Sequence, residues 1–306
     1  MTEPVWYAVV LSWNGREETL RCLDSLARVS DPPIRVVCVD NGSIDGSVEA
    51  IRQRHPDVHL IENGTNLGFS EGNNVGLRWA LEQGGEWMVL INNDTVVAED
   101  AFAGFAEVAA EHPGAGALAG KIYLAEPPDR IWFAGQRYLT WLGYSGRARG
   151  SGRRDSARYR EVVPTDRAAG ALMAVSRRAI ERAGLLPDDL FAYVEDVDWS
   201  LRIRDAGFEV LFAPGARAWH TVAASTGGPA STHNLYYGTR NTVVVCERHR
   251  PLPAPFTSLR RGVVLATFAA HALRRPNRRA GLAAVWEGYR DARDGRLGER
   301  PSSARR

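Results

Sequence analysis

Residues 34–47 have the sequence IRVVCVDNGSIDGS. The first seven residues are a short apolar run rich in β-branched side chains, and such a run predicts a buried strand. The remainder is rich in Asp, Asn, Gly and Ser, which favour turns. Ser47 can then cap a helix that we expect to end near Arg54. This succession of strand, turn and helix is typical of an α/β protein.

The same succession extends in both directions along the chain. Further strands are predicted at residues 5–11, 58–62 and 87–91. Helices are expected at about 17–29 and, after a loop rich in Gly and Asn at 63–74, up to about residue 83. Strands and helices that alternate at this spacing favour a mostly parallel, Rossmann-like sheet flanked by helices. In such sheets, ligands bind at the carboxyl ends of the strands.

The second half of the chain is irregular at first and ends in a helical extension. Residues 125–165 show no clear pattern. Beyond them, a strand, two helices and a second strand are predicted at 170–176, 177–184, 196–207 and 209–214. Residues 221–232 are a linker by composition. The tail beyond the linker is predicted to be helical, with prolines 251, 253, 255 and 276 as breaks.

The composition is that of a soluble globular protein with a sizeable core. The chain has 306 residues, 44% of them hydrophobic and 24% charged, which excludes a disordered protein, a collagen-like fibre and a disulfide scaffold. The three cysteines form no CxxC pair, so a zinc cluster or a redox dithiol is not expected. Neither a signal peptide nor an apolar stretch of about 18–20 residues is visible, so we expect a cytoplasmic protein.

Charge is distributed unevenly along the chain. Residues 240–306 carry 15 Arg against 5 Asp or Glu, whereas residues 1–239 carry 23 basic against 31 acidic side chains. A basic tail can bind a membrane surface or another polyanion, which would place the protein at the inner face of the membrane. A solvated, partly disordered tail explains the same charge equally well. Nucleic acid is not expected as a partner.

Carboxylates follow two of the predicted strands. Asp40 ends the second strand, and Asp94 follows the fourth within INNDT. In a parallel sheet both would lie at one edge, where an acid can meet a ligand hydroxyl, a base or a metal. Either residue alone is more simply explained as a turn-forming Asp. The pair in one crevice favours a ligand site.

A second group of acids, Glu195, Asp196 and Asp198, lies at the start of a predicted helix. Crowded carboxylates raise one another's pKa, which suits proton abstraction. The alternative is that these acids compensate the helix dipole. His220 ends a strand-like run and, with Asp94, would complete a mixed oxygen and nitrogen site of the kind that binds Mn²⁺ or Mg²⁺. A lone histidine, however, is more often structural.

Several segments, taken together in their order and spacing, are specific. They are VVLSWNG (9–15), VDNGSIDGS (39–47), NLGFSEGNNVGL (66–77), LINNDT (90–95), residues 170–220 and YYGTRN (236–241). The set resembles family 2 glycosyltransferases, which have the GT-A fold, and within them is most similar to the rhamnosyltransferase-like branch. The resemblance covers about residues 5–245.

The resemblance implies roles for individual residues. Asp40 would contact the nucleotide base, Asn93 would lie near the ribose, and Asp94 would bind a metal that bridges the diphosphate of the donor. Asp196 would be the catalytic base that deprotonates the acceptor hydroxyl, supported by Glu195. The residues implied as donor-binding are Ser12, Asn14, Asp40, Asn66, Gly68, Asn73, Asn92, Asn93, Arg240 and Asn241.

The implied metal is Mg²⁺ or Mn²⁺, held by Asp94 and His220. The triplet at 92–94 departs from the family pattern by having Asn at its first two positions, so only Asp94 can supply an anionic ligand. Arg240, after a mobile loop, is implied to contact a donor phosphate. Aromatic residues at 132–144 could stack on an acceptor sugar, although core packing is their more common use. The acceptor-binding residues expected are Trp141, Gly170, Ala171 and Glu195.

The implied activity is a metal-dependent, inverting transfer of a sugar from a nucleotide diphosphate donor to an acceptor hydroxyl. The donor would be dTDP-rhamnose or a similar dTDP- or UDP-sugar, and the acceptor a glycan, a lipid-linked molecule or a natural product. Residues 1–222 would form the catalytic domain, with the nucleotide-sugar half at about 1–124 and the acceptor half at about 125–222. Residues 223–306 would form a mobile loop and a basic helical extension.

Three other functions fit parts of the sequence. A nucleotide-binding oxidoreductase would have GxGxxG after the first strand, where this chain has SWNGRE at 12–17, so it is excluded. A nucleotidyltransferase would normally have a Gly-rich, basic phosphate loop there, and Arg16 alone is weak support. A non-catalytic nucleotide-sugar-binding protein stays open, although Asp94, Asp196 and His220 argue against it.

Overall fold

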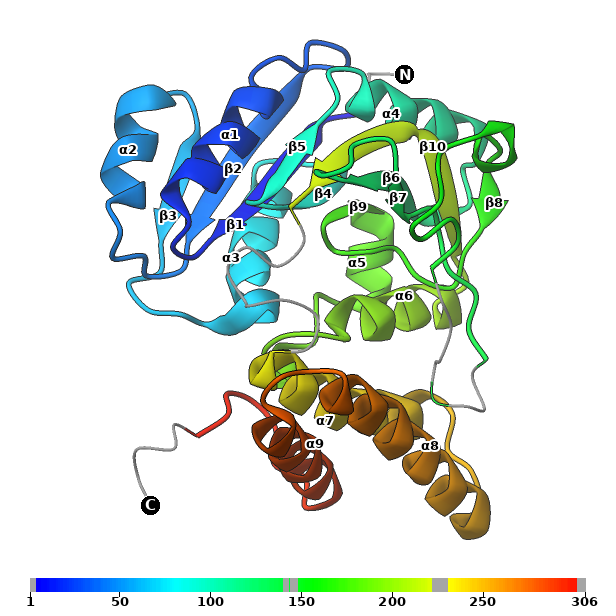
Figure 1. Ribbon diagram of the computed structural model, residues 1–306. Coiled ribbons are helices and arrows are strands. Elements are labelled where there is room, and N and C mark those ends of the chain that lie inside the picture. The colour runs from blue at the N-terminus through cyan, green and yellow to red at the C-terminus, as the bar shows by residue number, and fades with distance from the viewer. Residues whose placement is uncertain (1–3, 140–142, 144–147, 222–230, 302–306) are drawn as a thin grey trace.

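The apolar runs of the sequence form the strands of one sheet in a computed structural model, which describes residues 4–139, 143, 148–221 and 231–301 (Figure 1). The strands are β1 (Trp6–Ser12), β2 (Ile34–Asp40), β3 (His59–Glu62), β4 (Trp87–Asn92), β5 (Thr95–Val97), β6 (Ala115–Leu124), β7 (Ile131–Phe133), β8 (Val163–Pro164), β9 (Leu172–Ser176) and β10 (Glu209–His220). Their order in the sheet is β3-β2-β1-β4-β9-β6-β10-β5, with β7 beside β6 and β8 beside β10.

The first four strands pair in parallel, as predicted. Ser12 at the end of β1 lies opposite Asp40 of β2, and Leu11 lies opposite Asn92 of β4. Farther along the sheet, β9 runs antiparallel to β4 and β6, and β5 runs antiparallel to β10. The sheet as a whole is therefore mixed. The carboxyl ends of β1, β2 and β4 meet at one edge, where the sequence places its first group of polar residues.

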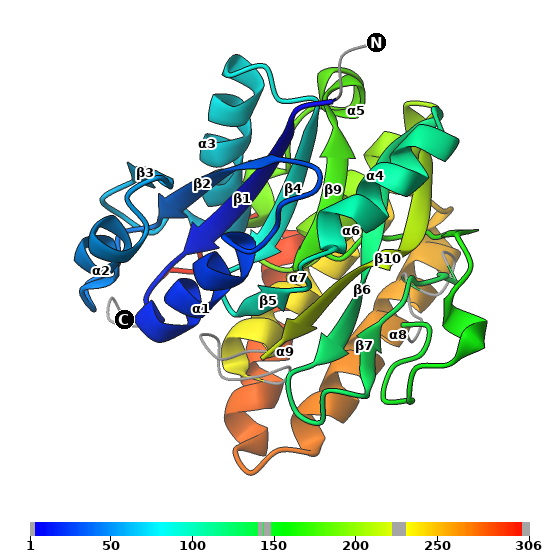
Figure 2. The same cartoon turned by 90° about the horizontal axis from the view of Figure 1, so that it is seen from above.

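Helices cover both faces of this sheet. They are α1 (Arg16–Leu26), α2 (Ser47–Arg54), α3 (Gly68–Glu82), α4 (Ala101–Glu111), α5 (Arg177–Ala183) and α6 (Glu195–Asp205). The helices α1 and α4 lie on one face, and α3, α5 and α6 lie on the other (Figures 1 and 2). Single 3-10 turns occur at Ala157–Tyr159 and Asp188–Leu190. Cover on both faces explains why the central strands are unbroken apolar runs.

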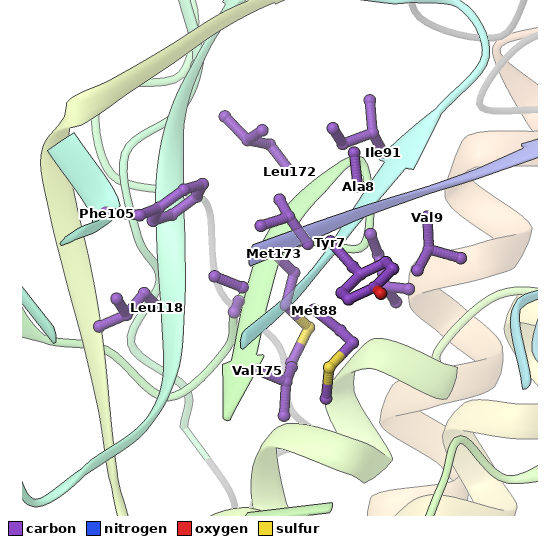
Figure 3. Close-up of a cluster of buried hydrophobic side chains, with 14 of the residues drawn as sticks. Tyr7, Ala8, Val9, Met88, Ile91, Phe105, Leu118, Leu172, Met173 and Val175 are labelled. Atoms are coloured by element: carbon purple, nitrogen blue, oxygen red, sulfur yellow. The ribbon is translucent and has the colours of Figure 1, made fainter. Parts of the chain in front are cut away.

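Aromatic rings pack tightly around β1. Trp6 stacks on Trp87 with ring centroids 5.4 Å apart, and it meets Phe102 edge-on at 6.2 Å. Figure 3 shows the neighbouring side chains of the core, among them Val9, Met88, Ile91, Phe105, Leu118, Leu172, Met173 and Val175. Because protein interiors are close-packed, this core holds the strand ends as a fixed frame for the polar residues beyond them.

The helix α3 begins earlier than predicted. The sequence indicated a loop over 63–74, but the helix starts at Gly68. Asn66 Oδ1 accepts a hydrogen bond from Gly68 N at 2.9 Å, and Asn73 Nδ2 donates to Phe69 O at 2.9 Å. Gly and Asn indicate a loop by composition. Here, however, the Asn side chains form hydrogen bonds within the first turns of a helix, and that helix begins with a glycine. These two bonds are local, and Asn74 Nδ2 adds a tertiary hydrogen bond to Leu186 O at 3.0 Å.

The C-terminal extension is helical, as predicted. It consists of α7 (Thr232–His249), α8 (Ala254–Leu273) and α9 (Arg278–Arg293), which form a layer beyond α6 (Figure 1). Pro255 lies in the first turn of α8 instead of ending a helix, because that position needs no backbone donor. The predicted linker at 221–232 falls largely outside the described residues. Within the described ranges, none of the helices combines the length and apolar character needed to cross a membrane.

Two helical glycines should respond in opposite ways to alanine. A Cβ at Gly104 of α4 would collide with the backbone of Gly215 and Ala216 in β10, whereas a Cβ at Gly262 of α8 would have nothing within 4 Å. We expect Gly104→Ala to lower the free energy of unfolding by about 1–3 kcal/mol. Gly262→Ala should raise it by up to about 1 kcal/mol. Urea unfolding followed by circular dichroism measures both, and an undiminished stability of Gly104→Ala would contradict this packing.

Candidate active site

A large cavity opens at the carboxyl edge of the sheet, with a volume of about 2110 Å³. The ends of β1 and β4 and the start of α3 form one wall, α6 and the loop before it a second, and α7 and α9 a third. The predicted site residues that line it are Asn66, Gly68, Asn92, Asn93, Asp94, Gly170, Ala171, Glu195, Asp196 and His220. Residues from distant parts of the sequence thus meet in one space.

Asp94 and His220 face each other across this cavity wall. The antiparallel pairing of β5 and β10 places His220 opposite Thr95, so its ring lies next to the preceding carboxylate. Asp94 Oδ1 and His220 Nε2 are 2.9 Å apart, and both residues are buried. The ring of Trp132 lies edge-on to that of His220, with centroids 5.1 Å apart. Two potential ligand atoms therefore converge on one point.

These two side chains fit a divalent cation. Despite their proximity, Asp94 Oδ1 and both ring nitrogens of His220 make no hydrogen bond with any described group. Buried polar atoms are normally satisfied, and one carboxylate oxygen with one imidazole is a donor set suited to Mn²⁺ or Mg²⁺. In the described ranges, no group of three His, Cys, Asp or Glu could hold an ion by itself. Further ligands would have to come from a bound molecule and water.

Asn93 lines the cavity, and hydrogen bonds to neighbouring residues hold its side chain in place. Its Nδ2 donates to Thr19 Oγ1 at 2.9 Å, and Thr19 Oγ1 lies 3.0 Å from Ser12 Oγ. Asn14 Oδ1 accepts from Ile44 N at 3.0 Å and so ties the loop after β1 to the loop after β2. Ser12 and Asn14, predicted to contact the donor, therefore lie behind the cavity wall and support it.

Asp40 forms a turn with one oxygen and leaves the other without a partner. Its Oδ2 accepts from Gly42 N at 3.0 Å and from Ser43 N at 2.9 Å. Its Oδ1 is buried, with no hydrogen bond to any described group. A role in the turn therefore explains the contacts of Oδ2 of Asp40 but not the burial of its Oδ1. Like Asn73, Asp40 lies outside the set of side chains that line the cavity, so its contact with a base stays a prediction.

The carboxylate of Asp196 has two different oxygens. Oδ2 accepts from Arg167 Nε at 2.9 Å, from Arg167 Nη2 at 2.6 Å and from Gly170 N at 3.1 Å. Oδ1 is buried and has no hydrogen-bond partner in the described part of the chain. A carboxylate that is held through one oxygen presents the other in a defined direction, which is what a general base requires.

The neighbouring Glu195 has an unusual proton affinity. Burial raises the pKa of Glu195 to about 8, and the nearby charge of Asp196 acts in the same direction. Two adjacent buried carboxylates do not readily ionise together. Near neutral pH, Glu195 is therefore largely protonated, while Asp196 holds the ion pair with Arg167. Glu195 and Asp196 therefore differ in their surroundings, since Asp196 is paired with Arg167 and Glu195 is not.

The backbone just before these acids is strained. Phe191, Tyr193 and Val194 have φ values of 63°, 66° and 73°, which is rare for residues with side chains and most costly for a β-branched valine. Glycine at position 68 is needed beside this loop, because a Cβ at Gly68 would meet the ring and carbonyl of Phe191. Phe69 N also donates to Phe191 O at 2.6 Å. The start of α3 thus supports the strained loop from one side.

Asn241 and Arg240 hold the same loop from the other side. Asn241 Nδ2 contacts three carbonyl oxygens between Leu190 and Tyr193 at 2.8–2.9 Å, and Arg240 Nη2 donates to Leu190 O at 2.9 Å. Arg240 is 1% exposed and lies against two tyrosine rings of α7. The structure therefore does not bring Arg240 and Asn241 into the cavity, where the family resemblance had implied a contact with donor phosphate.

The segment after α9 also binds to α7 and to the loop before α6. Arg240 Nη1 donates to Gly298 O at 2.7 Å, and Gly298 N donates to Asp189 O at 2.7 Å. Arg300 N donates to Tyr237 Oη, also at 2.7 Å. The loop before α6, the helix α7 and the segment after α9 are therefore one hydrogen-bonded unit.

Asp198 has a structural role and does not line the cavity. It is fully buried, accepts from Arg202 Nε at 2.8 Å and from Arg248 Nη1 at 3.0 Å, and lies 2.8 Å from His249 Nε2. Burial alone would raise the pKa of Asp198, but the hydrogen bond with His249 and the two arginines lower it to about 2. The acid cluster predicted at the start of α6 therefore divides, with Asp198 fastening α6 to α7.

Some residues of the cavity had no signal in the sequence. Arg167 is one of 37 arginines, and its neighbourhood, TDRAAG, contains no motif. Trp286 reaches the cavity from α9, and only the tertiary fold places it there. Tyr237 reaches the cavity from α7 and lies within the YYGTRN segment, which indicated no role for it. Trp132 does lie in the aromatic stretch that was considered for the acceptor. Trp141, predicted in the same stretch, lies outside the described residues.

The chain is similar in sequence to known rhamnosyltransferases. The chain is 28% identical over 260 residues to the N-acetylglucosaminyl-diphospho-decaprenol L-rhamnosyltransferase of Mycobacterium tuberculosis (strain ATCC 25618 / H37Rv), covering 79% of this chain and 84% of the relative. It is 22% identical over 257 residues to the dTDP-rhamnosyl transferase RfbF of Shigella flexneri, covering 80% and 81%.

Solved structures share the fold. The mannosyltransferase PcManGT from Pyrobaculum calidifontis, solved in complex with GDP-Man and Mn²⁺, superposes with a TM-score of 0.60 at 19% identity, over 96% of this chain and 87% of that one. TarS 1-349 of S. aureus, solved in complex with UDP, superposes with a TM-score of 0.55 at 16% identity, over 95% and 90%. These likenesses confirm the GT-A type of α/β fold.

The family model described as "Glycosyltransferase like family 2" matches residues 4–238. That range contains the sheet, the Asp94–His220 pair and the acids of α6. The resemblance to this family and to its rhamnosyltransferases is thereby confirmed. The chain belongs to glycosyltransferase family 2 and is a glycosyltransferase.

Proposed function

We propose that this enzyme transfers a sugar from a nucleotide diphosphate donor to an acceptor hydroxyl in one inverting displacement. The observation that carries the proposal is Oδ1 of Asp196, a buried carboxylate oxygen with no hydrogen-bond partner among the described residues, in a side chain that lines the same cavity as the Asp94–His220 pair. A retaining enzyme of the double-displacement type needs a second carboxylate as nucleophile. Glu195, the other acid beside Asp196, is largely protonated, so one base is available.

Asp94 and His220 would hold Mg²⁺ or Mn²⁺, with the diphosphate and water as further ligands. When bound, the ion neutralises the negative charge that develops on the leaving diphosphate. The neighbouring residues position the donor. Asn93, fixed by Thr19, lies next to Asp94 at the cavity wall, where its side chain can bind the ribose. Asn66 and Gly68 border the same wall.

Asp196 would accept the proton of the acceptor hydroxyl at Oδ1. Arg167 and the backbone amide of Gly170 keep Oδ2 in place, so the base does not rotate away from the acceptor. The ion pair with Arg167 also fixes the orientation of the Asp196 carboxylate through Oδ2. Glu195, protonated, would donate a hydrogen bond to the acceptor without competing for its proton.

We propose a dTDP-activated deoxyhexose, with rhamnose first, as the donor and a lipid-linked glycan as the acceptor. Support comes from the two relatives, one of which is a dTDP-rhamnosyl transferase and the other an N-acetylglucosaminyl-diphospho-decaprenol L-rhamnosyltransferase. The third wall of the cavity also supports a long acceptor, because α7 and α9 extend the space well beyond the Asp94–His220 pair.

Nucleotide binding should depend on the metal pair. In calorimetric titrations with dTDP, UDP and GDP, we expect dTDP to bind with Mn²⁺ and to lose affinity when the ion is chelated. Asp94→Asn should weaken metal-dependent binding by at least about tenfold. Asp129→Asn, a half-exposed carboxylate outside the cavity lining, serves as the control. Equal binding of all three nucleotides with and without metal would contradict the proposed site.

Turnover should depend on Asp196. Asp196→Asn keeps the shape of the side chain but removes the base, so transfer should fall by roughly 10²-fold or more, while dTDP titrates as in the wild type. Asp205→Asn, at the exposed end of the same helix, is the matched control. Transfer assays with dTDP-rhamnose measure both. Unchanged turnover in Asp196→Asn would refute this base, and a wild type that binds donor without transferring sugar would identify a non-catalytic binding protein.

Glu195 should make stability depend on pH. The folded protein keeps the proton of Glu195 up to about pH 8, whereas an ordinary glutamate has a pKa of 4.5. The folded state therefore binds more protons across this window, and raising the pH through it costs up to about 1.4 kcal/mol of folding free energy per pH unit. Glu195→Gln removes that cost, so the stability gain of the variant over the wild type should grow with pH.

Urea unfolding between about pH 5 and pH 8 measures this difference. Glu181→Gln, an exposed glutamate of α5, is the control and should follow the wild type at every pH. A constant difference between Glu195→Gln and the wild type would show that Glu195 is ionised throughout the window.

A further inference from the structure

The segment 248–286 combines two unusual properties. It contains eight Arg and not one Asp or Glu. It also holds five of the eight large hydrophobic side chains that are exposed in the described ranges. These five are Phe256, Leu259, Leu273, Leu282 and Trp286. The segment spans all of α8, the α8–α9 turn and the first half of α9, and we call its outward side the α8–α9 surface.

Six exposed residues of α8 form a continuous apolar stripe. They are Phe256, Leu259, Gly262, Ala266, Ala270 and Leu273. Their spacing of three or four residues places them on one side of the helix. The buried residues Val264 and Ala272 lie on the other side, which packs on α7 and α9. The stripe itself has no charge or hydrogen-bonding side chain, and the exposed Ser258, Thr267 and His271 lie beside it.

Cations gather at one end of this stripe. Arg274, Arg275, Arg278 and Arg279 are all exposed in and around the α8–α9 turn. Elsewhere on the surface most arginines are paired with acids, but in the described part of the chain these four have no carboxylate within 4 Å. An apolar stripe that ends in free guanidinium groups matches the acyl and phosphate layers of a bilayer surface.

The α8–α9 surface adjoins the active-site cavity. Phe268 of α8 and Ala280 and Trp286 of α9 line the same cavity as Asp196. These helices form the layer farthest from the sheet (Figure 1). A bilayer in contact with α8 would therefore lie next to the third wall of the cavity.

We propose that the α8–α9 surface docks on an anionic lipid bilayer, with α8 lying in the interface and the four arginines on lipid phosphates. A second copy of this surface is a poorer occupant, because the segment contains no carboxylate to pair with the arginines. The docking itself needs no activity. Only its use, to bring a lipid-linked acceptor to Asp196, rests on the proposed function.

Sedimentation of the full chain with vesicles tests the docking. We expect binding to phosphatidylcholine vesicles that contain phosphatidylglycerol, little binding to phosphatidylcholine alone, and weaker binding as salt rises. The double variant Phe256→Ser with Leu259→Ser should lower vesicle affinity by about tenfold or more. The double variant Arg274→Gln with Arg275→Gln should lower it by roughly tenfold.

Matched controls lie on other surfaces of the molecule. Ile44→Ser removes a highly exposed apolar side chain near α2, and Arg153→Gln with Arg154→Gln removes an adjacent pair of exposed arginines. Both should bind vesicles like the wild type. Circular dichroism and dTDP titration show whether each variant is folded.

Three results would overturn the docking. They are a wild type that does not bind anionic vesicles, binding that both α8–α9 variants retain in full, and light scattering that shows a dimer lost in the Phe256, Leu259 variant. Vesicle binding without any sugar transfer would instead overturn the proposed function and leave the docking intact. Transfer to a soluble acceptor without vesicle binding would overturn the docking alone.

Discussion

The position of Glu195 and Asp196 at the cavity depends on a short backbone segment that would not keep its shape alone. Residues 191–194 include three non-glycine residues at positive φ, and each such residue costs about 1–3 kcal/mol. The side chain of Asn241 donates hydrogen bonds to carbonyl groups in and next to this segment, and Phe69 N donates to Phe191 O from the opposite side. Helix α6 can begin at Glu195, with its acids at the cavity, only while these contacts hold.

The nucleotide side of the cavity obeys a simpler constraint. The parallel strands β1, β2 and β4 end at one edge of the sheet, which brings together loops that are distant in the sequence. Hydrogen bonds tie this edge together, for example from Ile44 N to Asn14 Oδ1 and from Asn93 Nδ2 to Thr19 Oγ1 of α1. Among the described residues, the atoms left without a hydrogen bond include Oδ1 of Asp40, Oδ1 of Asp94 and the ring nitrogens of His220. Unsatisfied buried atoms are costly, and a metal-bound nucleotide is the kind of ligand that would satisfy them.

The sequence predicted what depends on local pattern or on a family motif. The four parallel strands follow from their apolar runs, and Asp94, His220 and Asp196 do line one cavity, as their motifs implied. Asn241 and Arg240 were assigned to the donor because a motif gives residue identity but not the direction of a side chain. Arg167 was missed because ion pairs between distant segments leave no periodic signal. The early start of α3 was missed because its Gly and Asn residues serve tertiary contacts.

The bonds between Gly298, Arg240 and the loop before α6 have a consequence for how such enzymes diversify. A boundary near residue 222 looks like a natural point for exchanging the C-terminal helices between related enzymes. Yet α7 supplies the anchors of the loop before α6, and the segment after α9 is fastened to both. A recombined chain with foreign C-terminal helices would lose the position of the α6 acids unless residues 189–194 came from the same parent. The loop before α6 and the C-terminal helices are therefore constrained to evolve together.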